Sequence, residues 1–204
     1  MTKLKEINKK ENRTLVVFDV GCNIDQSLLT DFTENFLNYC SDAKVIAIEP
    51  IHYEAYEKKY KTDNRITLIK NALSYSSDNR IFFDTKIHGC PGLSSFVERS
   101  IFKDWGDGVR KTTVECTTVD NICQKFNLEK IDYLKIDTEG AELDVLKGSA
   151  KMMSERKINY IQFEFGGCAI EAGYGAEDIQ NYLKKYGYFV VGRCGDDYLA
   201  VLEN

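Results

Sequence analysis

Four acidic residues stand where predicted strands end. They are Asp19 in "FDVG", Glu49 in "AIEP", Asp137 in "KIDTEG" and Glu164 in "FEFGG". The carboxyl ends of parallel strands meet at one edge of a sheet, so we expect these side chains to lie close together. Carboxylates placed in this way can accept hydrogen bonds from ribose hydroxyls, pair with an amine, or take the proton of a reacting hydroxyl.

The glycine spacing after the first predicted strand narrows the choice of ligand. A dinucleotide-binding turn needs the pattern G-x-G-x-x-G, because its backbone must approach a pyrophosphate closely. Here Gly21 is followed by "CNID", so the second and third glycines are absent. This disfavours a pyrophosphate, and with it an NAD-dependent oxidoreductase. A ligand with positive charge and no phosphate fits better beside Asp19 and Asp25. S-adenosylmethionine, which carries an amine and a sulfonium, is such a ligand.

Further candidates follow the strand that ends at Asp137. Glu139 and Glu142 lie three residues apart, on the first turn of the helix predicted next. Together these three acids could hold a divalent cation, orient an acceptor hydroxyl, or only favour the helix N-terminus. No histidine or further placed acid joins them, so we predict no metal. The candidates for a general base are Asp137, Glu139, Glu164 and His88, the last in a glycine-rich stretch.

Apolar runs that alternate with segments of helical period must position these residues. Strand-like runs cover residues 14–20, 44–50, 65–74, 130–137 and 158–165, and two closing runs, 189–193 and 197–204, are predicted to be antiparallel to each other. This alternation predicts an α/β fold. We expect a seven-stranded, mostly parallel sheet with helices on both faces and an antiparallel last strand. Residues 1–204 then form a single domain.

Two segments fall outside this alternation. Residues 1–13 carry basic residues diluted by Glu6 and Glu11, which is typical of a solvated N-terminal arm. Residues 78–118 form an insertion with two short strands of its own around a glycine-rich stretch. Insertions of this kind often carry substrate-contacting loops, and we expect this one to contribute to the substrate site. Ser94 and Ser95 could form a substrate-facing turn there.

The composition limits the partners and the location. A formal net charge of -5 gives no electrostatic footprint for nucleic acid. The seven cysteines contain no C-x-x-C pair, which favours reduced thiols and a cytoplasmic location over a disulfide framework or a zinc site. No run approaches the roughly 18 apolar residues of a membrane span. We expect a small-molecule or glycan acceptor as the partner, and a monomer or homodimer.

Several of these motifs resemble the FkbM family of class I S-adenosylmethionine-dependent methyltransferases. "FDVGCN" is similar to the first motif of that family and "AIEP" to the second. "LKIDTEGAELDVLKG" is the most specific element of a resemblance that runs from about Val16 to Gly187. The resemblance implies a Rossmann-like fold and O-methylation of a hydroxyl, commonly on a sugar or a polyketide-like natural product.

The resemblance also implies which residues bind the cofactor. By motif position, Asp19, Gly21 and Asn23 line the methionine half of S-adenosylmethionine, Glu49 binds the ribose, Asn71 and Ala72 lie near the adenine, and Asp137 stands at the junction with the substrate. Asp25 is a departure, because the family usually has glycine there. It could cap a helix, pair with the amine of the cofactor, or weaken binding. This departure motivates one alternative, a non-catalytic relative that acts as a partner or scaffold protein.

Overall fold

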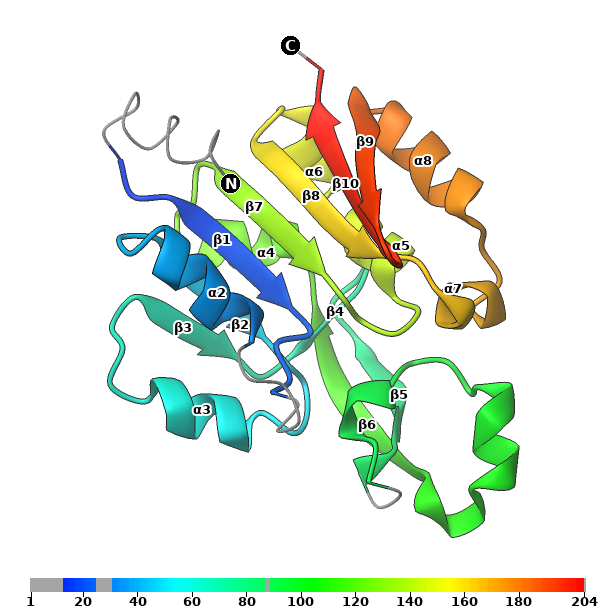
Figure 1. Cartoon of the computed structure of the whole chain (residues 1–204). Helices are drawn as coiled ribbons and strands as arrows, with labels where there is room; N and C mark the ends of the chain where they lie inside the picture. Colours follow the sequence, from blue (N-terminus) through cyan, green and yellow to red (C-terminus); the bar gives the residue numbers. More distant parts are fainter. Residues whose placement is uncertain (1–12, 25–30, 87–88, 204) are drawn as a thin grey trace.

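A seven-stranded sheet forms the centre of the molecule (Figure 1). The computed structural model describes residues 13–24, 31–86 and 89–203. The strands, in spatial order, are β3 (Ile66–Ile69), β2 (Lys44–Ile48), β1 (Val16–Val20), β7 (Ile131–Ile136), β8 (Ile158–Glu164), β10 (Asp197–Leu202) and β9 (Tyr188–Cys194). β10 is antiparallel to both of its neighbours, and the other paired strands are parallel. The predicted fold class is confirmed.

Helices cover both faces of this sheet (Figure 1). α2 (Phe32–Tyr39) and α3 (Glu54–Tyr60) pack on one face; α4 (Val119–Lys125), α5 (Glu142–Lys147), α6 (Ala150–Ser154) and α8 (Ala176–Lys184) pack on the other. A short helix, α7 (Gly167–Glu171), follows β8. Central strands covered on both faces read as continuous apolar runs, which explains why β1 and β2 bury four of their five residues.

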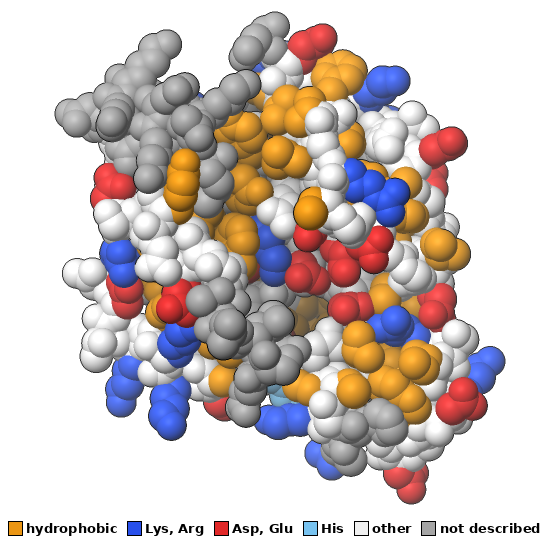
Figure 2. Space-filling view, in the orientation of Figure 1, with side chains coloured by type: hydrophobic (Ala, Val, Ile, Leu, Met, Phe, Trp, Pro, Cys, Tyr) orange, Lys and Arg blue, Asp and Glu red, His pale blue; other side chains and the backbone are white. Residues whose placement is uncertain are grey.

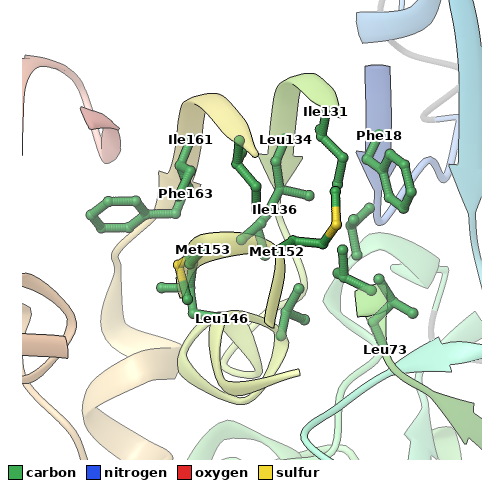
Figure 3. Packing of buried hydrophobic residues seen from close by; sticks show 14 of the residues in the cluster. Phe18, Leu73, Ile131, Leu134, Ile136, Leu146, Met152, Met153, Ile161 and Phe163 are labelled. Carbon is green, nitrogen blue, oxygen red and sulfur yellow. The ribbon is translucent and has the colours of Figure 1, made fainter. Parts of the chain in front are cut away.

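The packing of α5 and α6 fixes the position of β7. Figure 3 shows Leu146, Met152 and Met153 of these helices against Leu134 and Ile136 of β7, with Ile161 and Phe163 of β8 beside them. Burial of each large apolar side chain stabilises the fold by roughly 1.5–3 kcal/mol. The loop that leaves β7 at the carboxyl edge of the sheet therefore starts from a firmly held strand.

A second, smaller sheet joins the predicted insertion, residues 78–118, to the segment just before it. It contains β4 (Ala72–Leu73), β6 (Arg110–Thr117) and β5 (Asn79–Asp84), in that order. Three short 3-10 helices, η2 (Pro91–Leu93), η3 (Ser100–Asp104) and η4 (Gly106–Gly108), lie between β5 and β6. The single strand predicted over 65–74 is wrong. The chain leaves the large sheet after Ile69 because Ala72 packs against apolar residues of the small sheet and pairs with β6.

The N-terminal prediction needs one correction. Residues 1–12 lie outside the described part of the chain, but Arg13 is held rather than solvated. Both terminal nitrogens of Arg13 donate to the carboxylate of buried Asp132, each at 2.6 Å. Within the described residues, none of the helices combines the length and the apolar character needed to span a bilayer.

Candidate functional site

The turn after β1 lies directly against the end of β7. The backbone N–H of Gly21 donates to Ile48 O at 2.9 Å, and that of Asp137 donates to Val20 O at 3.1 Å, so the ends of β1, β2 and β7 are joined. Gly21 has a φ of +77°, and a Cβ built on it would lie 1.8 Å from Asp137 O. Only glycine allows this approach of the two strand ends.

Lys135 lies behind this turn. Its Nζ donates to Gly21 O at 3.0 Å and lies 3.3 Å from Asp19 Oδ1 and 3.3 Å from Asp137 Oδ2. Burial alone would lower the pKa of Lys135, but the carboxylates of Asp19 and Asp137 outweigh burial and raise that pKa. The ammonium therefore stays charged, although only 9% of the side chain is exposed.

Asp19 is buried behind the turn, beside Lys135. It is 1% exposed, and its Oδ2 accepts a hydrogen bond from the Thr33 hydroxyl at 2.8 Å. Burial raises the pKa of Asp19, while Lys135 and Thr33 act against that rise. Lys135 contacts Asp19 and also Gly21 and Asp137, so Asp19 is connected to the turn through Lys135.

Glu49 closes the end of β2. It is 7% exposed, and its Oε1 accepts a hydrogen bond from the backbone N–H of Ile51 at 3.1 Å. Burial raises the pKa of Glu49 to about 8, although that hydrogen bond and Lys135 oppose the rise. A desolvated carboxylate is stabilised strongly by added donors, so this position suits a ligand with adjacent hydroxyls.

Glu142 braces the loop after β7. Its carboxylate accepts hydrogen bonds from the backbone and hydroxyl of Thr138 at 2.9 and 2.8 Å, from the Gly140 N–H at 3.2 Å and from the Tyr174 hydroxyl at 2.6 Å. Glu142 is 2% exposed. The prediction that Glu139 lies on the first turn of the helix is wrong, because α5 begins at Glu142. Glu142 is on that turn as predicted, but its side chain points inward.

The braced loop holds two residues in the left-handed region. Glu139 has a φ of +54° and Gly140 a φ of +103°. Such a conformation costs a non-glycine residue of order 1–3 kcal/mol, and it is found mostly at functional sites. Glu139 Oε2 accepts a hydrogen bond from Arg99 at 3.2 Å and another from Cys168 Sγ at 2.6 Å. Burial raises the pKa of Glu139, while both donors oppose the rise.

Glu164, at the end of β8, completes a cluster of carboxylates with Asp137 and Glu139. One oxygen from each residue lies within 4.8 Å of the other two. Burial raises the pKa of Glu164 to about 8, and the charges of Asp137, Glu139 and Glu142 add to the rise. Among the described residues, these three carboxylates are the one group placed to hold a metal ion. The same arrangement suits a group that accepts a proton near neutral pH.

A cavity of about 270 Å³ brings most of the predicted residues together. Its lining includes Gly21, Asn23, Glu49, Asn71, Ala72, Asp137, Glu139 and Glu164. Figure 2 shows acidic side chains gathered near the centre of one face, between the large sheet and the insertion. Asp19 is not part of the lining, and His88 and Asp25 lie outside the described residues.

The insertion supplies the opposite wall of this cavity. Phe82 and Phe96 line it and meet edge to face, with ring centroids 5.0 Å apart. Ser94 also lines it, but its Oγ accepts a hydrogen bond from the Thr85 N–H at 3.1 Å. Ser95 is fully buried. The predicted substrate-facing turn therefore brings Ser94, but not Ser95, to the cavity.

The carboxyl edge of the sheet also opens toward a wider groove of about 900 Å³. Four residues line both the groove and the cavity: Asn23, Pro91, Gly92 and Glu139. His52 lies on it, with Nε2 2.7 Å from Asp84 Oδ1, and so joins the loop after β2 to the insertion. One molecule could therefore bind in the cavity while a second binds beside it in the groove.

Comparison with known proteins identifies the family. A family model described as the methyltransferase FkbM domain matches residues 19–190. The chain belongs to the FkbM methyltransferase family. No curated protein is similar enough in sequence to match. A solved structure, the methyltransferase FkbM from Methylobacillus flagellatus KT, is similar in fold, with a TM-score of 0.60 and 17% identity over 92% of this chain. The match covers 43% of that protein, so this chain spans less than half of its length.

Within this FkbM methyltransferase domain, sequence reasoning missed two charged residues of the site, Lys135 and Arg99. Lys135 had a usable signal, because a lysine inside an apolar strand, "DYLKI", indicates a buried ion pair. Arg99 had none, since its segment shows neither helical nor strand periodicity. Membership of the family supports methyl transfer as the general activity.

Proposed function

We propose that the chain is an S-adenosylmethionine-dependent O-methyltransferase that acts on a hydroxyl of a sugar, a glycan or a related small natural product. The observation that carries the proposal is one cavity lined by the Gly21 turn, the buried carboxyl of Glu49, and the Asp137 and Glu164 carboxylates. S-adenosylmethionine supplies an electrophilic methyl group and carries no phosphate. A lining with four acidic residues suits that cationic ligand and disfavours a pyrophosphate.

The residues of the sheet edge would hold the cofactor. Glu49 would accept hydrogen bonds from the ribose hydroxyls, while Gly21 and Asn23 would lie beside the methionine half. Asn71 and Ala72, where the chain passes from the large sheet to the small one, would lie near the adenine. Asp19, which we predicted as a direct contact, would act from behind through Lys135.

The carboxylate cluster would handle the acceptor. Glu164 would take the proton of the acceptor hydroxyl, because its pKa of about 8 lies close to a physiological operating pH. Asp137 and Glu139 would orient that hydroxyl, and correct placement alone can supply much of the acceleration. His88 stays a predicted alternative base.

Calorimetry with S-adenosylhomocysteine, the demethylated product, tests the proposal, with NAD⁺ as the comparison ligand. We expect saturable binding of the former and none of the latter. A panel of hydroxyl-bearing sugars and natural products, incubated with methyl-labelled S-adenosylmethionine, then tests turnover by mass spectrometry. A folded protein that releases no heat with S-adenosylhomocysteine would overturn the proposal.

A second outcome distinguishes the non-catalytic alternative. A protein that binds S-adenosylhomocysteine, methylates no acceptor in the panel and stimulates a companion enzyme would be a scaffold or partner protein. Replacement of Glu164 would then leave that stimulation unchanged, because no proton has to move.

A further inference from the structure

Lys135 is a charged residue inside the apolar central strand β7. We infer that Lys135 is a positioning residue of the proposed methyl-transfer site, which holds the Gly21 turn and the Asp137 carboxylate in one fixed arrangement. The inference rests on the proposed function. It assigns the site a residue that acts through others and touches neither cofactor nor acceptor.

Lys135 Nζ makes one hydrogen bond and two ion pairs. An ammonium has three N–H donors and no acceptor. Three oxygens lie within reach of Nζ, namely Gly21 O at 3.0 Å, Asp19 Oδ1 at 3.3 Å and Asp137 Oδ2 at 3.3 Å. The ring of Phe32 lies on another side, with its centroid 5.9 Å from Nζ. Lys135 is not among the residues that line the cavity, so its effect on the site passes through Gly21 and Asp137, which do line it.

Those three oxygens belong to two strand ends that both face the cavity. Asp19 and Lys135 are register partners across β1 and β7, so a single side chain spans the seam between the strands. Gly21 and Asp137 line the cavity. The Asp137 side chain is 44% exposed, so without the ammonium it would be free to rotate into other rotamers.

Asp19 and Asp137 respond differently to the loss of Lys135. Asp19 is 1% exposed, so loss of its cation leaves a buried carboxylate uncompensated, which destabilises the fold. Asp137 can turn toward water instead. A variant that neutralises Asp19 at the same time therefore separates the effect on folding from the effect on the site.

The test compares Asp19→Asn with the double variant Asp19→Asn/Lys135→Met. Circular dichroism and thermal unfolding check the fold, and calorimetry measures the Kd for S-adenosylhomocysteine. We expect the double variant to bind at least about tenfold more weakly than Asp19→Asn at a similar Tm. Lys147→Met, which removes a surface pair with Asp144, is the control and should bind like the parent protein.

Hydrogen exchange of the ligand-free proteins gives a second readout that needs neither cofactor nor acceptor. We expect faster exchange in the peptides that contain Gly21 and Asp137 in the double variant than in Asp19→Asn. Lys135→Arg, which keeps the charge but changes the donor geometry, should fold and show a smaller change in the same peptides. If the double variant does not fold, the exchange rates of Lys135→Arg test the inference in its place.

The outcomes separate the inference from the proposed function. If the parent protein binds S-adenosylhomocysteine and both Asp19 variants bind within twofold of each other, the inference fails and the function stands. If the parent protein does not bind, the function fails. Unchanged exchange at both peptides in the double variant and in Lys135→Arg would overturn the positioning role independently.

Discussion

The sheet edge and the insertion form opposite walls of one cavity and are built in different ways. On the sheet side, Gly21, Glu49 and Lys135 are held by neighbouring strand ends and are buried or tightly packed. On the insertion side, the wall comes from η2 and the segment around Phe96. The Ser94 hydroxyl bonds to Thr85 and the Ser95 hydroxyl to Val97, so both serines use these hydroxyls within the insertion.

Gly21 on the sheet side and Gly92 on the insertion side show the difference between the two walls. A Cβ on Gly21 would meet Asp137 O at 1.8 Å, whereas a Cβ on Gly92 would meet nothing within 4 Å. At these two positions the sheet side has no space for a methyl group, whereas the insertion side has. This contrast fits a proposed site in which one wall binds an invariant cofactor and the other a particular acceptor.

The largest expected effect comes from a matched pair, Gly21→Ala and Gly92→Ala. We expect Gly21→Ala to lower the free energy of unfolding by at least about 2 kcal/mol, because of backbone strain and overlap, and to abolish measurable S-adenosylhomocysteine binding. Gly92→Ala should leave both unchanged. Denaturant unfolding and calorimetry measure the two quantities. If both substitutions lowered stability and binding to the same extent, the proposed difference between the two walls would be wrong.

Glu164→Gln should lower kcat by roughly 10²- to 10⁴-fold, the usual contribution of a positioned base. The Kd for S-adenosylhomocysteine should change by less than about threefold, because Glu49 and the Gly21 turn are untouched. Turnover of an acceptor found in the panel measures the first quantity and calorimetry the second. Glu155→Gln, which removes a surface partner of Lys157, is the control. A variant with full kcat would mean that another group takes the proton.

At a pH above about 8, where Glu49 is ionised, Glu49→Gln should weaken S-adenosylhomocysteine binding by roughly 10- to 100-fold, since hydrogen bonds to a charged group contribute about 1.5–3 kcal/mol. The substitution should also change how stability depends on pH. The folded protein keeps the Glu49 proton up to a pKa of about 8, whereas an ordinary glutamate loses it near 4.5.

Stability of the ligand-free protein should therefore fall as pH rises from about 4.5 to 8, because folding retains a proton that the unfolded chain releases. Glu164 contributes a slope of the same sign. Thermal unfolding at several pH values measures the slope, which should be shallower in Glu49→Gln. A parent protein whose stability rises across this window would contradict the burial of these carboxyls.

The smallest expected effect is that of Arg99→Met, which removes the ion pair between the insertion and Glu139. We expect the KM for the acceptor to rise about three- to tenfold while the Kd for S-adenosylhomocysteine stays constant. Hydrogen exchange in the insertion should also become faster. Arg110→Met, at the start of β6, is the control. If Arg99→Met changed the Kd for S-adenosylhomocysteine and left the KM for the acceptor unchanged, Arg99 would belong to the cofactor side of the site and the prediction would be wrong.

The sheet side could be predicted from the sequence because its signals are local. Buried apolar runs located the strands, and the acids after them identified the edge where strands end. What could not be predicted depends on contacts distant in sequence. Glu142 turns inward because Tyr174 and the loop at Thr138 meet it, and the run over 65–74 divides because Ala72 finds a partner in β6.

On the insertion side, the sequence located β5 and β6 but, of the residues that face the cavity, it indicated only Ser94. Residues 91–108 form 3-10 helices and bends, which impose no regular alternation of inward and outward side chains. Phe96 and Arg99 could therefore not be distinguished from their neighbours. Three-dimensional packing decides which of them reach the site.

The pairing of β4 with β6 has an evolutionary consequence. Ala72 and Leu73 lie beside Cys116 and Thr117, so the chain enters and leaves the insertion at the same place. The segment between Leu73 and Cys116 can therefore change in length or sequence while the strand order of the large sheet stays the same. In evolution, exchange of this single segment could change the acceptor while the large sheet and its edge stay the same.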